Sequence, residues 1–134
     1  MSEVLVSEKK FKEGGFRLYV DKELKLVKDV WNGKCDTNEL EQGLGAVKVE
    51  MLKYNKGEAL LLHETSNLDM KLWSAEQAKI AKDYTLTAVS YFKKTAFVYT
   101  SFMHQKATES ATGALPDNFK YCTSEQEARK FLLS

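Results

Sequence analysis

The alternation of apolar and polar residues along this chain predicts short strands separated by amphipathic helices. Runs rich in β-branched, aromatic or leucine side chains indicate strands, and apolar residues spaced three or four apart indicate helices. Two residues separate the first two strands, a spacing that favours a hairpin. The expected strands are 16–20, 23–31, 58–64, 95–101 and 119–122, and the expected helices lie between Asp36 and 55–57, and over 74–92, about 102–111 and 124–133.

The starts of three of these helices carry a capping-box pattern. In this pattern a polar side chain accepts a hydrogen bond from a free helix N–H, and a Glu or Gln three residues later reaches back. The first of these helices contains Gly43 and Gly45, which each cost about 1 kcal/mol relative to alanine in a helix. The capping pairs are Asp36 with Glu39, Ser74 with Gln77, and Ser124 with Glu127.

The resulting element order is β-β-α-β-α-β-α-β-α. A hairpin followed by alternating strands and helices predicts an α/β fold, in which helices pack on a mixed, mostly parallel sheet of about five strands. Residues 1–12 are interpreted as a polar N-terminal lead-in, and residues 1–134 as a single domain.

Composition and charge narrow the classes of function. The 20 basic and 19 acidic residues are interspersed and give a net charge of +1, so nucleic-acid binding, which favours a basic excess, is disfavoured. No apolar run approaches the 18 residues of a membrane-spanning helix, and the first residues contain no signal-peptide core. Cys35 and Cys122 lie far apart in the sequence, unlike a disulfide framework or a zinc motif. We therefore expect a reduced, cytoplasmic protein.

Polar residues follow three of the expected strands, at 63–66, 100–106 and 122–125. Ligands of open α/β sheets bind beyond the carboxyl ends of the strands, so His63, His104 and Cys122 could meet at one edge. The sequence contains no GxSxG motif, which would indicate a nucleophilic site. A metal site of His63, Glu64 and His104 is chemically possible, but the spacing of these residues is not specific for a metal. No glycine-rich phosphate-binding loop is present. We therefore expect no catalytic residue, no metal and no cofactor, and we interpret these residues as caps and boundary residues.

Three stretches resemble the SpoIIAA-like fold shared by STAS domains and STAS/SEC14-type bacterial proteins. "ALLLHETS" is similar to their central strand and regulatory loop, and "FKKTAFVYTS" to the entry into their next strand. "FKYCTSEQEARKFL" is similar to their closing strand and helix, with Phe131 in place of the usual tryptophan. The resemblance covers the chain from about Phe16 onward, and it implies the fold and a regulatory role through protein contacts.

The resemblance departs from the family at the regulatory loop. Anti-sigma factor antagonists carry a pattern similar to "D-x-S-x-x-x-x-x-D-S-S-G", in which a helix-capping serine is phosphorylated. This chain has Trp73, Ser74 and Ala75 there, without the paired serine or the glycine. The phosphorylation therefore does not carry over to Ser74, although a helix N-terminus would stabilise a phosphate.

The first hypothesis is a non-enzymatic regulatory domain that contacts a protein partner or a second copy of itself. Trp31 and Trp73 lie near the ends of expected elements, where a large side chain either closes the core or contacts a partner. The alternative is a small-molecule or lipid-binding module in the SEC14-like sense, and an enzyme is the third. An apolar cavity of a few hundred Å³ between the sheet and the helix starting at Ser74 would favour a ligand. The candidate regulatory or binding edge comprises His63, Glu64, Thr65, Ser66, Ser74, Ser101 and His104.

Overall fold

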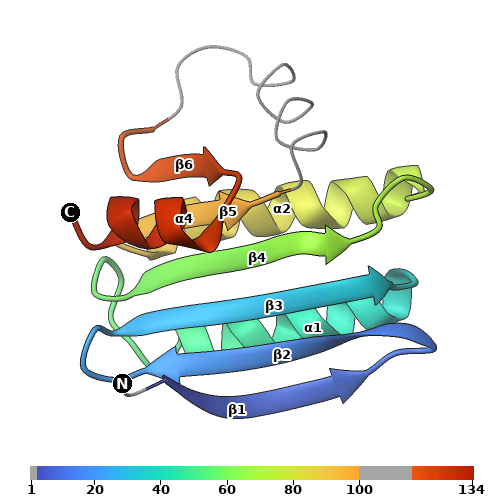
Figure 1. The fold of residues 1–134 in the computed structure, drawn as a ribbon, viewed down its shortest axis with the longest axis horizontal. Coiled ribbons are helices and arrows are strands. Elements are labelled where there is room, and N and C mark those ends of the chain that lie inside the picture. Colours follow the sequence, from blue (N-terminus) through green and yellow to red (C-terminus); the bar gives the residue numbers. More distant parts are fainter. Residues whose placement is uncertain (1–2, 100–115) are drawn as a thin grey trace.

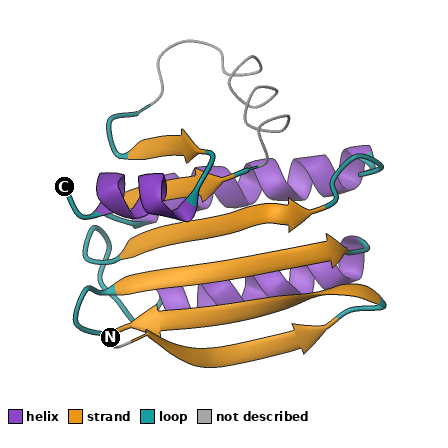
Figure 2. Ribbon diagram, viewed as in Figure 1, coloured by secondary structure: helices purple, strands orange, loops and turns teal. Residues whose placement is uncertain are grey.

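The computed structural model describes residues 3–99 and 116–134, which form a mixed α/β fold (Figures 1 and 2). Six strands lie in sequence order across one sheet, antiparallel from β1 to β3 and parallel from β3 to β6. The predicted fold class is confirmed. The elements are β1 (Glu3–Lys10), β2 (Glu13–Asp21), β3 (Leu26–Lys34), α1 (Thr37–Met51), β4 (Leu60–Leu68), α2 (Ala75–Tyr91), β5 (Lys94–Val98), β6 (Phe119–Cys122) and α4 (Glu125–Leu132).

The connections between the parallel strands place α1 and α2 on the same face of the sheet. Right-handed crossovers that step in one direction, from β3 to β4 to β5, put their helices on one side. The last helix, α4, covers the opposite face over β4, β5 and β6 (Figure 1). Each face therefore has its own apolar core.

The N-terminal segment differs from the prediction, because residues 3–10 form a strand, β1, in addition to the five predicted strands, and are not a lead-in. Its side chains are mostly exposed and alternate poorly, so the sequence pattern does not show a strand. Backbone pairing with β2 creates it, and charged residues are typical of such edge strands. Glu3 anchors its start, since its carboxylate contacts Lys28 at 2.5 Å and Arg129 at 2.6 Å.

The predicted hairpin is present as β2 and β3, but its turn is longer than two residues. Strand β2 ends at Asp21, and β3 begins at Leu26. The Asp21 carboxylate accepts a hydrogen bond from the backbone N–H of Leu24 at 3.1 Å, and Lys25 adopts a left-handed backbone with φ of 53°. These local bonds stabilise a longer turn that the spacing alone did not indicate.

Helix α1 forms where the apolar spacing predicted it, with the capping box of Asp36 and Glu39. Its Gly43 has a packing role that offsets its low helix propensity. A Cβ atom built at Gly43 would overlap the indole ring of Trp31, whereas one built at Gly45 meets nothing within 4 Å. Gly43 therefore lets the large ring of Trp31 lie directly against the helix backbone.

The other predicted helices have mixed outcomes. Ser74 and Gln77 form the expected capping box at the start of α2. At α4, Ser124 accepts from the Glu127 N–H at 3.1 Å, but Glu127 accepts from the N–H of Thr123, one residue before the cap. The helix predicted at about 102–111 lies outside the described residues.

The two faces of the sheet hold different cores. The face beneath α1 and α2 contains large aromatic side chains, including Phe16, Trp31 and Phe97. The face beneath α4 contains aliphatic and small side chains, namely Leu26, Leu60, Leu62, Ala96, Val98, Cys122, Ala128 and Leu132.

Candidate functional site

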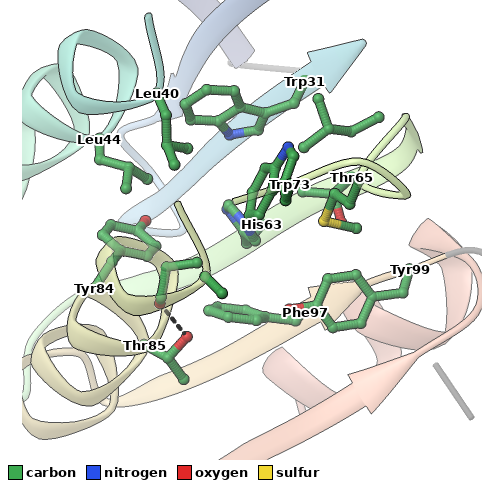
Figure 3. A pocket seen from close by; sticks show the side chains of 14 residues that line it. Trp31, Leu40, Leu44, His63, Thr65, Trp73, Tyr84, Thr85, Phe97 and Tyr99 are labelled. Atoms are coloured by element: carbon green, nitrogen blue, oxygen red, sulfur yellow. Dashed lines mark hydrogen bonds between the residues drawn. The ribbon is translucent and has the colours of Figure 1, made fainter. Parts of the chain in front are cut away.

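A cavity of about 380 Å³ lies between the sheet and helices α1 and α2 (Figure 3). Strands β3, β4 and β5 form its floor, the two helices form its sides, and the segment before α2 contributes Met70 and Trp73. Most of its lining is apolar or aromatic. The lining residues are Trp31, Leu40, Leu44, His63, Thr65, Leu68, Met70, Trp73, Ala78, Ala81, Tyr84, Thr85, Phe97 and Tyr99.

A buried polar cluster stands beside this cavity. The Asp29 carboxylate has no exposed surface, and its Oδ2 accepts from the Trp31 indole N–H at 2.7 Å and contacts His63 Nδ1 at 2.5 Å. An ionised carboxylate accepts hydrogen bonds and cannot donate them, so the proton of this hydrogen bond belongs to Nδ1. The second ring nitrogen of His63, Nε2, then has no hydrogen-bond partner among the described residues.

Strand pairing brings these residues together. In the parallel register Asp29 lies beside His63, and His63 lies beside Phe97 on the next strand. Because side chains of one strand alternate between the faces, Asp29 and Trp31 both point toward the helices. The His63 ring contacts the Phe97 ring at a centroid distance of 4.5 Å and the Tyr84 ring at 5.5 Å, which fixes its position.

Two hydrogen-bonding groups of the lining lack a partner. The Tyr84 hydroxyl and the Trp73 indole N–H are both buried without a hydrogen bond to any described residue, and an unsatisfied buried polar group costs about 1–3 kcal/mol. Burial, with the nearby Asp29 carboxylate, raises the pKa of Tyr84 well above its ordinary value. The hydroxyl therefore keeps its proton at neutral pH and is available as a hydrogen-bond donor.

The lining threonines, in contrast, have their hydroxyls occupied. Thr65 donates to the backbone carbonyl of Val98 at 2.8 Å, and Thr85 donates to that of Ala81 at 2.8 Å. Neither hydroxyl is directed at His63 as a nucleophile would be. Neither lining threonine is therefore arranged as a nucleophile activated by His63.

The predicted edge from His63 to Ser66 is divided between the two faces of the sheet. His63 and Thr65 line the cavity. Glu64 lies on the other face, where its Oε1 accepts from both the backbone N–H and the hydroxyl of Ser66, at 2.7 and 2.5 Å. The alternation of a β-strand produces this division.

The remaining predicted residues do not join His63 within the described structure. Ser74 caps α2, and Cys122 is buried in the core of the opposite face. Ser101 and His104 lie outside the described residues. Within 3–99 and 116–134, no group of three or more His, Cys, Asp or Glu residues could hold a metal ion.

The role of Asp29 was not predicted from the sequence. The structure places Asp29 between Val27 and Trp31 on the helix-covered face of β3. Because β3 is buried on both faces, its pattern is ambiguous. The available signal was an acidic residue two positions from both an apolar and an aromatic residue.

Within residues 3–99 and 116–134, the six-stranded sheet carries α1 and α2 on one face and α4 on the other. The chain resembles the crystal structure of an uncharacterised protein from Shewanella loihica PV-4, from the DUF3478 family with a SpoIIAA-like fold. The TM-score is 0.56 at 14% identity, over 98% of this chain and 94% of that chain. The similarity confirms the predicted fold.

The sequence comparisons add no family name. The chain matches no protein-family profile and no curated protein sequence. No helix in the described ranges is long and apolar enough to cross a membrane.

Proposed function

We propose that this protein binds a small, mostly apolar molecule in the cavity between α1, α2 and the sheet. The observation that carries the proposal is the cavity itself, whose volume of about 380 Å³ lies in the range of small-molecule sites. Concave sites of this size with a mostly apolar lining are typical of small-molecule binding sites. The alternative reading of the sequence, a ligand-binding module, is therefore the one that the geometry favours.

The polar groups of the lining support a binding role. A few convergent polar atoms in an apolar pocket are typical of ligand sites, and here His63, Tyr84 and Trp73 supply them. A non-enzymatic role is part of the proposal, because Thr65 and Thr85 direct their hydroxyls to backbone carbonyls. A cytoplasmic location stays a prediction from the sequence.

A neutral aromatic probe tests the proposal. We expect 2-acetylnaphthalene to bind the protein with a one-to-one stoichiometry in isothermal titration calorimetry. Ala81→Phe, which fills the cavity from α2, should abolish this binding. Ala75→Phe is the matched control, since Ala75 is exposed on the same helix and lies outside the lining. Equal binding by both variants, or no binding by the unmodified protein, would overturn the proposal.

A protein contact is the second candidate, and one observation favours it. The edge strand β1 exposes Val4, Leu5 and Val6, each by more than two fifths of its surface, beside backbone groups that a further strand could pair. A second copy of the chain is the expected partner. Trp31 takes no part, because only 1% of it is exposed.

Light scattering after size exclusion tests this contact. If β1 mediates self-association, the protein elutes as a dimer and Leu5→Lys elutes as a monomer. A monomeric mass for the unmodified protein at high concentration would remove the second candidate without affecting the cavity.

A further inference from the structure

We infer that the molecule bound in the cavity is a small aromatic carboxylic acid, with its carboxylate at His63 and its ring among the aromatic side chains. The inference rests on the proposed function and adds the charge and shape of the ligand. Three features of the lining carry it: one group that can become cationic, two unpartnered donors, and a predominance of aromatic surface.

The charge preference comes from His63. Among the fourteen lining residues it is the one whose side chain can carry a positive charge. Asp29 holds Nδ1, so Nε2 is the atom available to a ligand. A protonated ring would lie between the Asp29 carboxylate and the ligand carboxylate, donating a charge-assisted hydrogen bond to each.

The buried Asp29 carboxylate makes this arrangement favourable. Removing a charge from water is costly unless a partner compensates it. Within the described part of the chain, Asp29 has no lysine or arginine among its hydrogen-bond or ion-pair partners. A protonated His63 supplies that compensation. The Trp31 N–H also donates to Asp29 Oδ2, while the other oxygen, Oδ1, has no hydrogen-bond partner among the described residues.

The unpartnered donors favour an acceptor-rich head group. An indole N–H can only donate, and a carboxylate offers about four lone-pair sites. The Tyr84 hydroxyl, in a side chain of which only 4% is exposed, lacks a partner, as does the Trp73 indole N–H. Both side chains belong to the lining, and a ligand carboxylate is the kind of acceptor that these two donors lack.

The shape preference comes from the surrounding rings. Planar aromatic molecules pack well against aromatic side chains in stacked or edge-to-face arrangements. At roughly 30 Å³ for each water-sized group, the cavity holds about a dozen non-hydrogen atoms, which suits a naphthalene-sized acid. The aromatic lining residues are Trp31, Trp73, Tyr84, Phe97 and Tyr99 (Figure 3).

Calorimetric titration of the full chain at pH 7 with three probes tests the inference. We expect 2-naphthoate to bind about tenfold or more tightly than its neutral isostere 2-naphthamide, because one charge-assisted hydrogen bond is lost. It should also bind more tightly than decanoate, an aliphatic acid of similar size. Equal binding of naphthamide would overturn the carboxylate assignment, and equal binding of decanoate would overturn the aromatic one. In both cases the proposed function stands, whereas no binding by any probe would overturn both.

Two variants locate the carboxylate. Tyr84→Phe keeps the ring and removes a hydroxyl without a partner, so the affinity for 2-naphthoate should fall about tenfold while the melting temperature does not fall. His63→Gln should reduce it further, with folding checked by circular dichroism. Thr85→Val is the matched control, because it removes a lining hydroxyl that is already bonded to Ala81. Unchanged naphthoate affinity in folded Tyr84→Phe and His63→Gln would overturn the inference.

Discussion

The two faces of the sheet are built from the same strands and yet are packed very differently. On β4, Leu60 and Leu62 point into the aliphatic core beneath α4, while His63 and Thr65 line the cavity beneath α1 and α2. The first face has small or aliphatic side chains and a short helix, and the second has large rings and two long helices. Large rings at fixed positions leave space between them that aliphatic side chains would fill.

This contrast indicates where a function can be located. A core of buried aliphatic side chains contributes stability through burial. Buried polar atoms without a hydrogen-bond partner lower the stability of the folded protein. The polar cluster of Asp29, His63 and Trp31 lies only on the second face. Substitutions on the two faces should therefore differ in their effect on the free energy of unfolding.

Asp29→Ala should have the largest effect. It leaves the N–H groups of His63 and Trp31 buried without an acceptor, and breaking a buried pair of this kind costs about 3–5 kcal/mol. Glu64→Ala, on the other face, is the comparison: Glu64 is half-buried and bonds only Ser66, so we expect a loss of about 1 kcal/mol. Urea denaturation measures both, and equal losses would show that the cluster does not distinguish the faces.

Truncation of leucine should cost more in the aliphatic core beneath α4, where Leu62 has no exposed surface. Leu62→Ala opens a new void beneath α4, with an expected loss of free energy of unfolding of about 3 kcal/mol. Leu44 already borders the cavity, so fewer packing contacts are lost in Leu44→Ala and we expect about 2 kcal/mol or less. A larger loss for Leu44→Ala, by the same denaturation measurement, would contradict the difference in packing.

Two glycine substitutions in α1 should have opposite effects on the stability of the protein. Gly43→Ala places a methyl group against the Trp31 ring and should destabilise the protein by about 1–3 kcal/mol through overpacking. Gly45→Ala meets open space and should stabilise it by up to about 1 kcal/mol. Thermal melts of the two variants measure the signs. Stabilisation by Gly43→Ala would mean that Trp31 moves readily into the cavity.

The smallest expected difference between the two faces concerns the reactivity of the two cysteines, one of which lies in the core of each face. Burial raises the pKa of Cys35 and of Cys122 to about 11 each, so at pH 8 about 0.1% of each is the reactive thiolate. Reaction with a disulfide reagent should accelerate as the pH rises toward 11. Cys35, 8% exposed, should react before Cys122, which has no exposed surface; rapid labelling of both at pH 8 would contradict their burial.

The sequence predicted the elements well because their signals are local. The apolar spacing of α1, the capping boxes of α1 and α2, and the leucine run of β4 each extend over a few residues, and all of them are present. The sixth strand was missed because β1 is held by pairing with β2 and by the ion pairs of Glu3. The candidate site was predicted in part, since His63 and Thr65 line the cavity while Glu64 and Ser66 face the other side.

The α/β class and the positions of most strands and helices follow from the sequence, because the hydrophobic period and the helix caps act between neighbours along the chain. Which polar residues meet depends on how the elements pack. Asp29, His63 and Tyr84 come from three elements, and Asp29 and His63 are separated by 34 positions in the sequence. Strand register and helix packing bring them to one cavity, and no local preference of the chain encodes that distance.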